Sequence, residues 1–162
     1  MSVRSDIELL RQVPLFSEVD PGQLQVLVFS SERVEVAPDE ILFAAGSLVG
    51  AGHLVLQGQG AVLKPKSGEE DGEPEQVALV QAGAFLGELA MIADLPASVT
   101  VRAKTQLKVL RIGHELFLRV CSEFPEVGAK VLQALTQRLD TSLEDLRQVQ
   151  AHFDRARPFE AE

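Results

Sequence analysis

GAFLGELAMIADLPASVTVRA, residues 83–103, combines three local signals. A Gly87-Glu88 step opens a short apolar run with helical character, and a loop led by Pro96 follows it. The loop returns into a β-branched segment that ends at Ala103. A helix start carries unpaired N–H groups and the positive end of the helix dipole. A turn, a helix start and a facing loop therefore predict a small anion pocket.

Short β-prone runs recur on both sides of this stretch, between residues 33 and 112, with Gly, Pro and charged residues between them. Such regular spacing is typical of an antiparallel β-roll or jelly-roll barrel. The expected strands are Val34–Val36, Ile41–Phe43, Leu54–Leu56, Ala61–Leu63, Val77–Val80, Val99–Val101 and Leu107–Ile112.

Helical periodicity flanks the β-rich region. Residues 5–13 are amphipathic, and Asp20 is a good N-cap for a second helix from Pro21 to Ser30. The helical period returns at residues 114–122 and again in a long run from Pro125. We expect one α+β domain over residues 1–154, mainly β: N-terminal helices at 1–32, the β-roll at 33–112, C-terminal helices at 113–154, and a flexible tail at 155–162.

The last helical run carries a heptad pattern. Apolar residues follow steps of three and four once Ser142 is included, which is the seam of a coiled coil. The expected dimer-interface residues are Leu132, Leu135, Leu139, Leu146 and Val149. The pattern favours a parallel homodimer, and the alternative is a single amphipathic helix lying on its own barrel.

Composition narrows the function. The 162 residues carry a formal net charge of -9, and the 15 basic residues are scattered, which argues against nucleic acid as a partner. No apolar run approaches membrane-spanning length, and the N-terminus has acidic residues where a signal peptide would be apolar. We expect a soluble, cytoplasmic protein without a membrane partner.

The sequence offers no recognisable catalytic or metal motif. His53, His114 and His152 are far apart, and Cys121 is the only cysteine. Nucleophile-elbow, phosphate-loop and dinucleotide-binding patterns are missing from the sequence. We therefore expect a protein that is not an enzyme and that holds neither metal nor cofactor.

Together these features resemble the cyclic-nucleotide-binding domain family over about residues 10–149. The Phe-x-Gly-Glu-Leu-Ala motif at residues 85–90, the Pro-led loop and the long terminal helix carry the resemblance, which is closest to the sensor domain of the catabolite activator (Crp/Fnr) group. The early glycines Gly46 and Gly58 also match. The family's Asp-x-Gly-Asp between them is replaced by residues 47–50, Ser-Leu-Val-Gly.

The resemblance implies a phosphate-binding cassette over residues 85–100 and cyclic AMP or cyclic GMP as ligand. It implies that the N–H groups of Leu89 and Ala90 meet the cyclic phosphate and that Glu88 accepts the ribose 2′-hydroxyl. A Glu that only caps its helix is the alternative. A hydroxyl of Thr141 or Ser142 would reach the base across the dimer seam, or Ser142 would only set the register. The expected ligand-binding residues are Leu86, Gly87, Glu88, Leu89, Ala90, Ala97, Ser98, Val99, Thr141 and Ser142.

Ala97 departs from the family, which has a phosphate-clamping arginine at this position. A charged hydrogen bond contributes about 1.5–3 kcal/mol, so its loss predicts binding weakened by about tenfold or more. Alternation along the following strand directs Arg102 away from the face that carries the valines. Nothing in the sequence places Lys64 or Lys66 at the phosphate.

Two functions follow from this sequence. The first is a regulatory sensor domain that binds a cyclic nucleotide weakly or not at all and acts on an unknown protein effector. The second is a degenerate domain kept as a homodimerisation or protein-interaction module without ligand. DNA binding is disfavoured in both, because only about a dozen residues follow the long helix.

Overall fold

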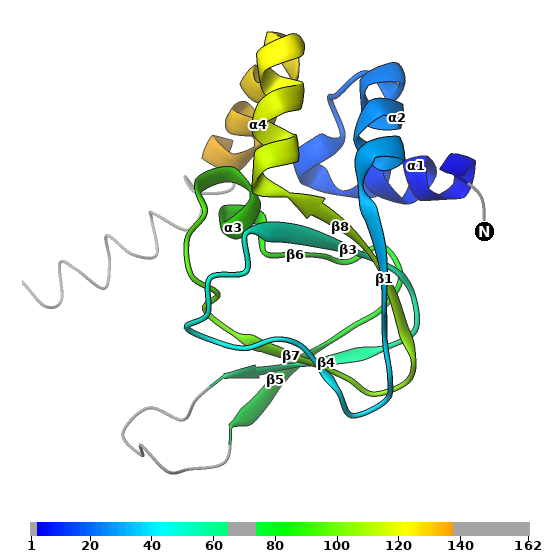
Figure 1. The fold of residues 1–162 in the computed structure, drawn as a ribbon, viewed down its shortest axis with the longest axis vertical. Helices are drawn as coiled ribbons and strands as arrows, with labels where there is room; N and C mark the ends of the chain where they lie inside the picture. The colour runs from blue at the N-terminus through cyan, green and yellow to red at the C-terminus, as the bar shows by residue number, and fades with distance from the viewer. Residues whose placement is uncertain (1–2, 65–73, 138–162) are drawn as a thin grey trace, which may run out of the picture.

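The computed structural model describes residues 3–64 and 74–137, and all structural statements concern these ranges. Figure 1 shows a β-roll with helices gathered at one end. The helices are α1 (Val3–Gln12), the short 3-10 helix η1 (Pro14–Phe16), α2 (Pro21–Ser30), α3 (Glu88–Ala93) and α4 (His114–Glu123), and residues 125–137 are also helical. The strands are β1 (Glu32–Val36), β2 (Ile41–Phe43), β3 (Ala51–Gln57), β4 (Gly60–Lys64), β5 (Glu75–Val80), β6 (Phe85–Leu86), β7 (Thr100–Ala103) and β8 (Leu107–Gly113).

The strands form two antiparallel four-stranded sheets. One sheet has the order β1-β8-β3-β6 and the other the order β2-β7-β4-β5. The predicted α+β fold with an antiparallel β-roll is confirmed, and each of the seven expected strands has its counterpart. The two-residue strand β6 was not predicted, because it is too short to show a period of its own; it pairs with β3 through His53 and Leu54.

The N-terminal helices form where local signals placed them. The Asp20 side chain accepts a hydrogen bond from the Gly22 N–H at 2.8 Å, which caps α2, and Pro21 occupies the first helical position. The helices pack on the β1-β8-β3-β6 sheet in a core to which Leu24, Leu54 and Leu110 contribute. This packing fixes the helices at one end of the roll.

Strand β3 is buried on both of its faces. Leu54 and Leu56 belong to the core beneath the helices, whereas Val55 lies inside the roll with Val109. All six residues from Ala51 to Leu56 are consequently buried, and the strand shows no polar–apolar alternation. The strand forms the central wall between the helices and the interior of the roll.

Asp6 is a charged residue of α1 that is fully buried. Its carboxylate forms an ion pair with the guanidinium of Arg33 in β1, which is half-exposed. The other carboxylate oxygen has no hydrogen-bond partner among the described residues. This pair therefore ties the first helix to the first strand.

The predicted coiled-coil seam lies mostly outside the described residues. Leu132 is exposed and Leu135 is half-buried, while Leu139, Leu146 and Val149 fall beyond residue 137. The homodimer stays a prediction. In the part of the chain that the structure describes, no helix combines the length and apolar character needed to cross a membrane.

His53 should make the fold sensitive to acid. Its ring is 3% exposed, and burial, together with the charge of Arg111, lowers its pKa from 6.5 to about 4. Between pH 6.5 and pH 4, His53 is protonated in the unfolded chain but stays neutral in the folded chain. The free energy of unfolding therefore falls as the pH drops through this range. We expect His53 to account for a loss of about 3 kcal/mol between pH 7 and pH 4.

Urea unfolding at both pH values measures this loss. In His53→Phe, whose ring can still pack on Phe43, the fall in the free energy of unfolding should be smaller by about that amount. An equal fall in the variant and the parent chain would show that His53 is not the group responsible.

Candidate functional site

The start of α3 and the loop that follows the helix enclose a pocket of about 330 Å³. Residues 85–90 line one side and residues 95–98 the other. We call this cavity the cassette pocket. It lies at the position where the sequence predicted a helix start and a facing loop to meet.

Gly87 makes the turn into α3. Its φ of 77° lies in the left-handed region, and a Cβ at this position would stand 3.0 Å from the carbonyl oxygen of Ala51. Both the conformation and the close approach require glycine. The N–H of Met91 bonds back to the Gly87 carbonyl at 3.0 Å, so the N–H groups of residues 88–90 precede the first helical bond and lie at the pocket.

Backbone hydrogen bonds hold the facing loop in place. The Gly46 N–H donates to the Ala97 carbonyl at 2.7 Å, and the Ala97 N–H donates to the Ser47 carbonyl at 2.9 Å. Both peptide groups that flank the Ala97 side chain are thus hydrogen-bonded to the turn at residues 46 and 47. The backbone position of Ala97 is therefore well fixed.

The charge of the cassette pocket comes from Glu88. Among the described residues that line the pocket, no other side chain carries an acidic or basic group. Leu89 and Leu95 are 44% and 46% exposed. The described lining offers backbone donors and one carboxylate, and it contains no cationic side chain.

Neighbouring basic side chains do not line the cassette pocket. Arg102 is exposed, whereas Val101 and Ala103 on either side of it are fully buried, so the predicted direction of Arg102 is confirmed. Lys64 is exposed at the end of β4 and is not part of the described lining. Lys66 lies outside the described residues.

Seven of the ten expected ligand-binding residues line the cassette pocket: Leu86, Gly87, Glu88, Leu89, Ala90, Ala97 and Ser98. Val99 does not line it; this residue lies just before β7 and packs on the apolar cluster that includes Phe43. Thr141 and Ser142 lie outside the described residues.

Three lining residues were not among those expected: Phe85, Leu95 and Pro96. Phe85 opens the predicted motif, and all three residues lie within the cassette expected over residues 85–100, which was the available signal. Phe85 also contacts the ring of Phe16 edge-on, with the centroids 5.4 Å apart. The cassette pocket is thereby anchored to the helical core at its first residue.

Comparison with known proteins agrees with this geometry. The family model described as cyclic nucleotide-binding domain matches residues 33–124. A cAMP-dependent protein kinase regulatory subunit from Blastocladiella emersonii is 27% identical over 118 residues, which are 73% of this chain and 28% of that protein. The chain thus spans little more than a quarter of the length of this relative.

Solved structures share the fold. The N-terminal domain of a transcriptional regulator from Streptomyces coelicolor A3(2) is 28% identical, with a TM-score of 0.75 over 83% of this chain and 94% of that one. The catabolite activator protein of Thermus thermophilus is 22% identical, with a TM-score of 0.70 over 85% of this chain and 63% of that one. The family match covers more than half of the sequence and includes the whole cassette pocket. The chain therefore belongs to the cyclic nucleotide-binding domain family.

Proposed function

We propose that this chain is a regulatory domain that binds cyclic AMP or cyclic GMP weakly in the cassette pocket. The observation that carries the proposal is the meeting of the α3 start, Glu88 and Ser98 around one cavity without a cationic side chain in its described lining. The domain performs no chemistry. The ligand binds one arrangement of the domain's helices more tightly than another, and ligand binding therefore shifts the domain toward that arrangement.

The phosphate and the ribose of the ligand each have a matching group in the cassette pocket. The N–H groups of Leu89 and Ala90 suit a phosphate monoanion, because they lie at the positive end of α3. The carboxylate of Glu88 suits the ribose 2′-hydroxyl as a charge-assisted acceptor. The volume of about 330 Å³ falls within the range of small-molecule sites.

The lack of a cation weakens the phosphate part of this recognition. The backbone donors of a helix of six residues must hold a full negative charge, while Glu88 brings a second negative charge into the same cavity. Like charges repel in a partly enclosed site. The ligand therefore binds through its sugar at least as much as through its phosphate.

The kinship supports a cyclic nucleotide as the ligand. A relative from Blastocladiella emersonii carries the name of a cAMP-dependent kinase regulatory subunit, and its similarity spans most of this chain. A protein effector, separate in sequence or in space, would read the helix arrangement.

Calorimetry and thermal melting with millimolar cyclic AMP and cyclic GMP test the proposal. We expect dissociation constants in the high micromolar to millimolar range and a rise in the melting midpoint, because a ligand that binds only the folded state stabilises it. Glu88→Gln should weaken binding by about tenfold or more. The matched control Glu40→Gln, an exposed carboxylate after the β1–β2 turn, should leave affinity unchanged.

A submicromolar dissociation constant would contradict the inference that the missing cation is uncompensated. If neither nucleotide shifts the midpoint, the sensor proposal fails and the alternative gains support. That alternative is a degenerate module for homodimerisation or protein interaction. The exposure of Leu132, 54% on the last described helix, favours this second candidate.

A further inference from the structure

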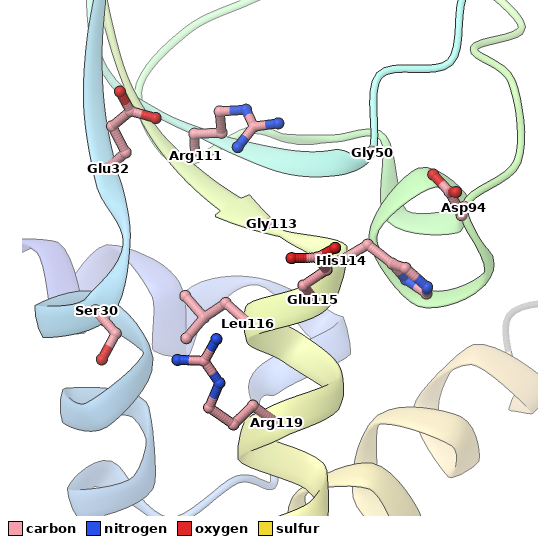
Figure 2. Close-up of a pocket in the computed structure, with 10 residues that line it drawn as sticks. All are labelled: Ser30, Glu32, Gly50, Asp94, Arg111, Gly113, His114, Glu115, Leu116 and Arg119. Atoms are coloured by element: carbon pink, nitrogen blue, oxygen red, sulfur yellow. The ribbon is translucent and has the colours of Figure 1, made fainter.

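A second cavity of about 520 Å³ lies where the β-roll meets helices α2 and α4. We call it the junction pocket. Its upper wall in Figure 2 is formed by Glu32 of β1 and Arg111 of β8, and its lower wall by Glu115, Leu116 and Arg119 of α4. None of these residues lines the cassette pocket. Each wall therefore presents one carboxylate and one guanidinium.

The charges of the upper wall are opposite each other in the sheet but form no ion pair. Glu32 and Arg111 are direct partners in the β1–β8 register, an arrangement that favours opposite charges. No contact within 4.0 Å joins them, and Arg111 instead donates to the Val49 carbonyl at 3.4 Å. Figure 2 shows Arg111 extending toward Gly50, away from Glu32.

The charges of the lower wall repeat this behaviour. Glu115 and Arg119 are four residues apart on α4, with the acid nearer the N-terminus, which is the favourable order for an ion pair. They form none within 4.0 Å in the described structure. Figure 2 shows their side chains on either side of Leu116. Each wall therefore contains a carboxylate and a guanidinium that are well placed for an ion pair but do not form one.

The balance of charge selects the kind of ligand. With Asp94 included, the lining carries three carboxylates and two guanidinium groups. A simple anion would face the carboxylates and a simple cation would face the guanidinium groups. A molecule that carries both charges satisfies both kinds of group, and guanidinium pairs especially well with a carboxylate. The volume leaves room for a side chain beyond the two charged groups.

We propose that the junction pocket binds a small zwitterion of the α-amino-acid class. The ligand's carboxylate pairs with Arg119 and its ammonium group pairs with Glu115, while Leu116 contacts the ligand's carbon skeleton. The proposal does not depend on nucleotide binding in the cassette pocket.

Hydrogen bonds link the elements that line the junction pocket to the helix that lines the cassette pocket. The His114 N–H, at the start of α4, donates to the Gly50 carbonyl at 2.8 Å, and its ring Nδ1 lies 2.6 Å from the Met91 carbonyl oxygen in α3. A ligand held by Glu115 and Arg119 would therefore act on α4, which contacts α3 of the cassette pocket.

Thermal melting of the whole chain with each of the twenty common L-amino acids tests the proposal. At least one of them should raise the melting midpoint by mass action. For L-leucine, the matched probes are 4-methylpentanoate, which lacks the ammonium group, and 3-methylbutylamine, which lacks the carboxylate. Neither of these should raise the midpoint when L-leucine does, and the equivalent pair applies to any other amino acid that binds.

Substitutions locate the site. Arg119→Gln and Glu115→Gln should each weaken amino-acid binding by about tenfold or more. The controls Arg102→Gln and Glu40→Gln, both exposed and away from the junction pocket, should not change it. The proposal is overturned if no amino acid shifts the midpoint, if the single-charge analogues bind equally well, or if Arg119→Gln binds like the parent chain. Cyclic AMP binding measured on the same variants reports separately on the cassette pocket.

Discussion

Ala97→Arg should tighten the binding of cyclic AMP and cyclic GMP by about ten- to several-hundredfold, because it restores a charged hydrogen bond to the phosphate. Ala97 lines the cassette pocket, and its peptide groups are fixed to Gly46 and Ser47 by two short hydrogen bonds. A longer side chain can therefore extend into the cavity without changing the backbone. Isothermal titration of the variant and the parent chain measures the gain.

Ala97→Gln is the matched control, since it adds length and hydrogen-bonding capacity without charge. It should recover only a small part of the gain. The benefit of the arginine should also shrink as salt is raised, because the pocket is open to solvent and the charges are screened. An arginine variant no better than the glutamine variant would show that charge is not what the cassette pocket lacks.

The sequence predicted the cassette pocket more fully than its surroundings because the pocket is built from adjacent residues. Gly87, Glu88 and Ala90 belong to one turn and a helix start, and a local rule links each of them to its neighbours. Val99 lies just before β7 and packs on the apolar cluster that includes Phe43, and it is not among the residues that line the pocket. Sequence proximity alone cannot tell which residues at the end of such a loop line the cavity.

Features that depend on contacts between distant segments were not predicted. Strand β6 exists because its two residues pair with β3, about thirty positions earlier. The junction pocket combines charges from β1, β8 and α4 with the carboxylate of Asp94, and the charges on β1, β8 and α4 belong to no motif. Asp6 looks in the sequence like an ordinary polar residue of an amphipathic helix, yet in the fold it is completely buried and paired with Arg33 of β1. Topology, rather than local pattern, decides all three.

Arg33→Met should reduce the free energy of unfolding by about 3 kcal/mol, because it leaves the Asp6 carboxylate buried without its counter-charge. The Asp6 side chain is fully buried, while the Arg33 side chain is 45% exposed, so solvent screens only one end of the pair. The expected loss in the free energy of unfolding is therefore near the lower end of the range for a broken buried ion pair. Urea unfolding at neutral pH measures it, with Arg11→Met as the control. Arg11 pairs with Glu8 on an exposed helix face at 3.2 Å, and its loss should cost less than about 1 kcal/mol.

The double variant Asp6→Leu with Arg33→Met separates the two explanations for such a loss. If the cost comes from an uncompensated charge, replacing both partners by apolar side chains should restore most of the stability, since a buried pair contributes little beyond its own desolvation. If Arg33 instead stabilises the fold through the packing of its aliphatic stem, the double variant should remain as unstable as Arg33→Met. Recovery would mean that the apolar core beneath the helices, and not the ion pair, supplies most of the energy that holds α1 on the domain.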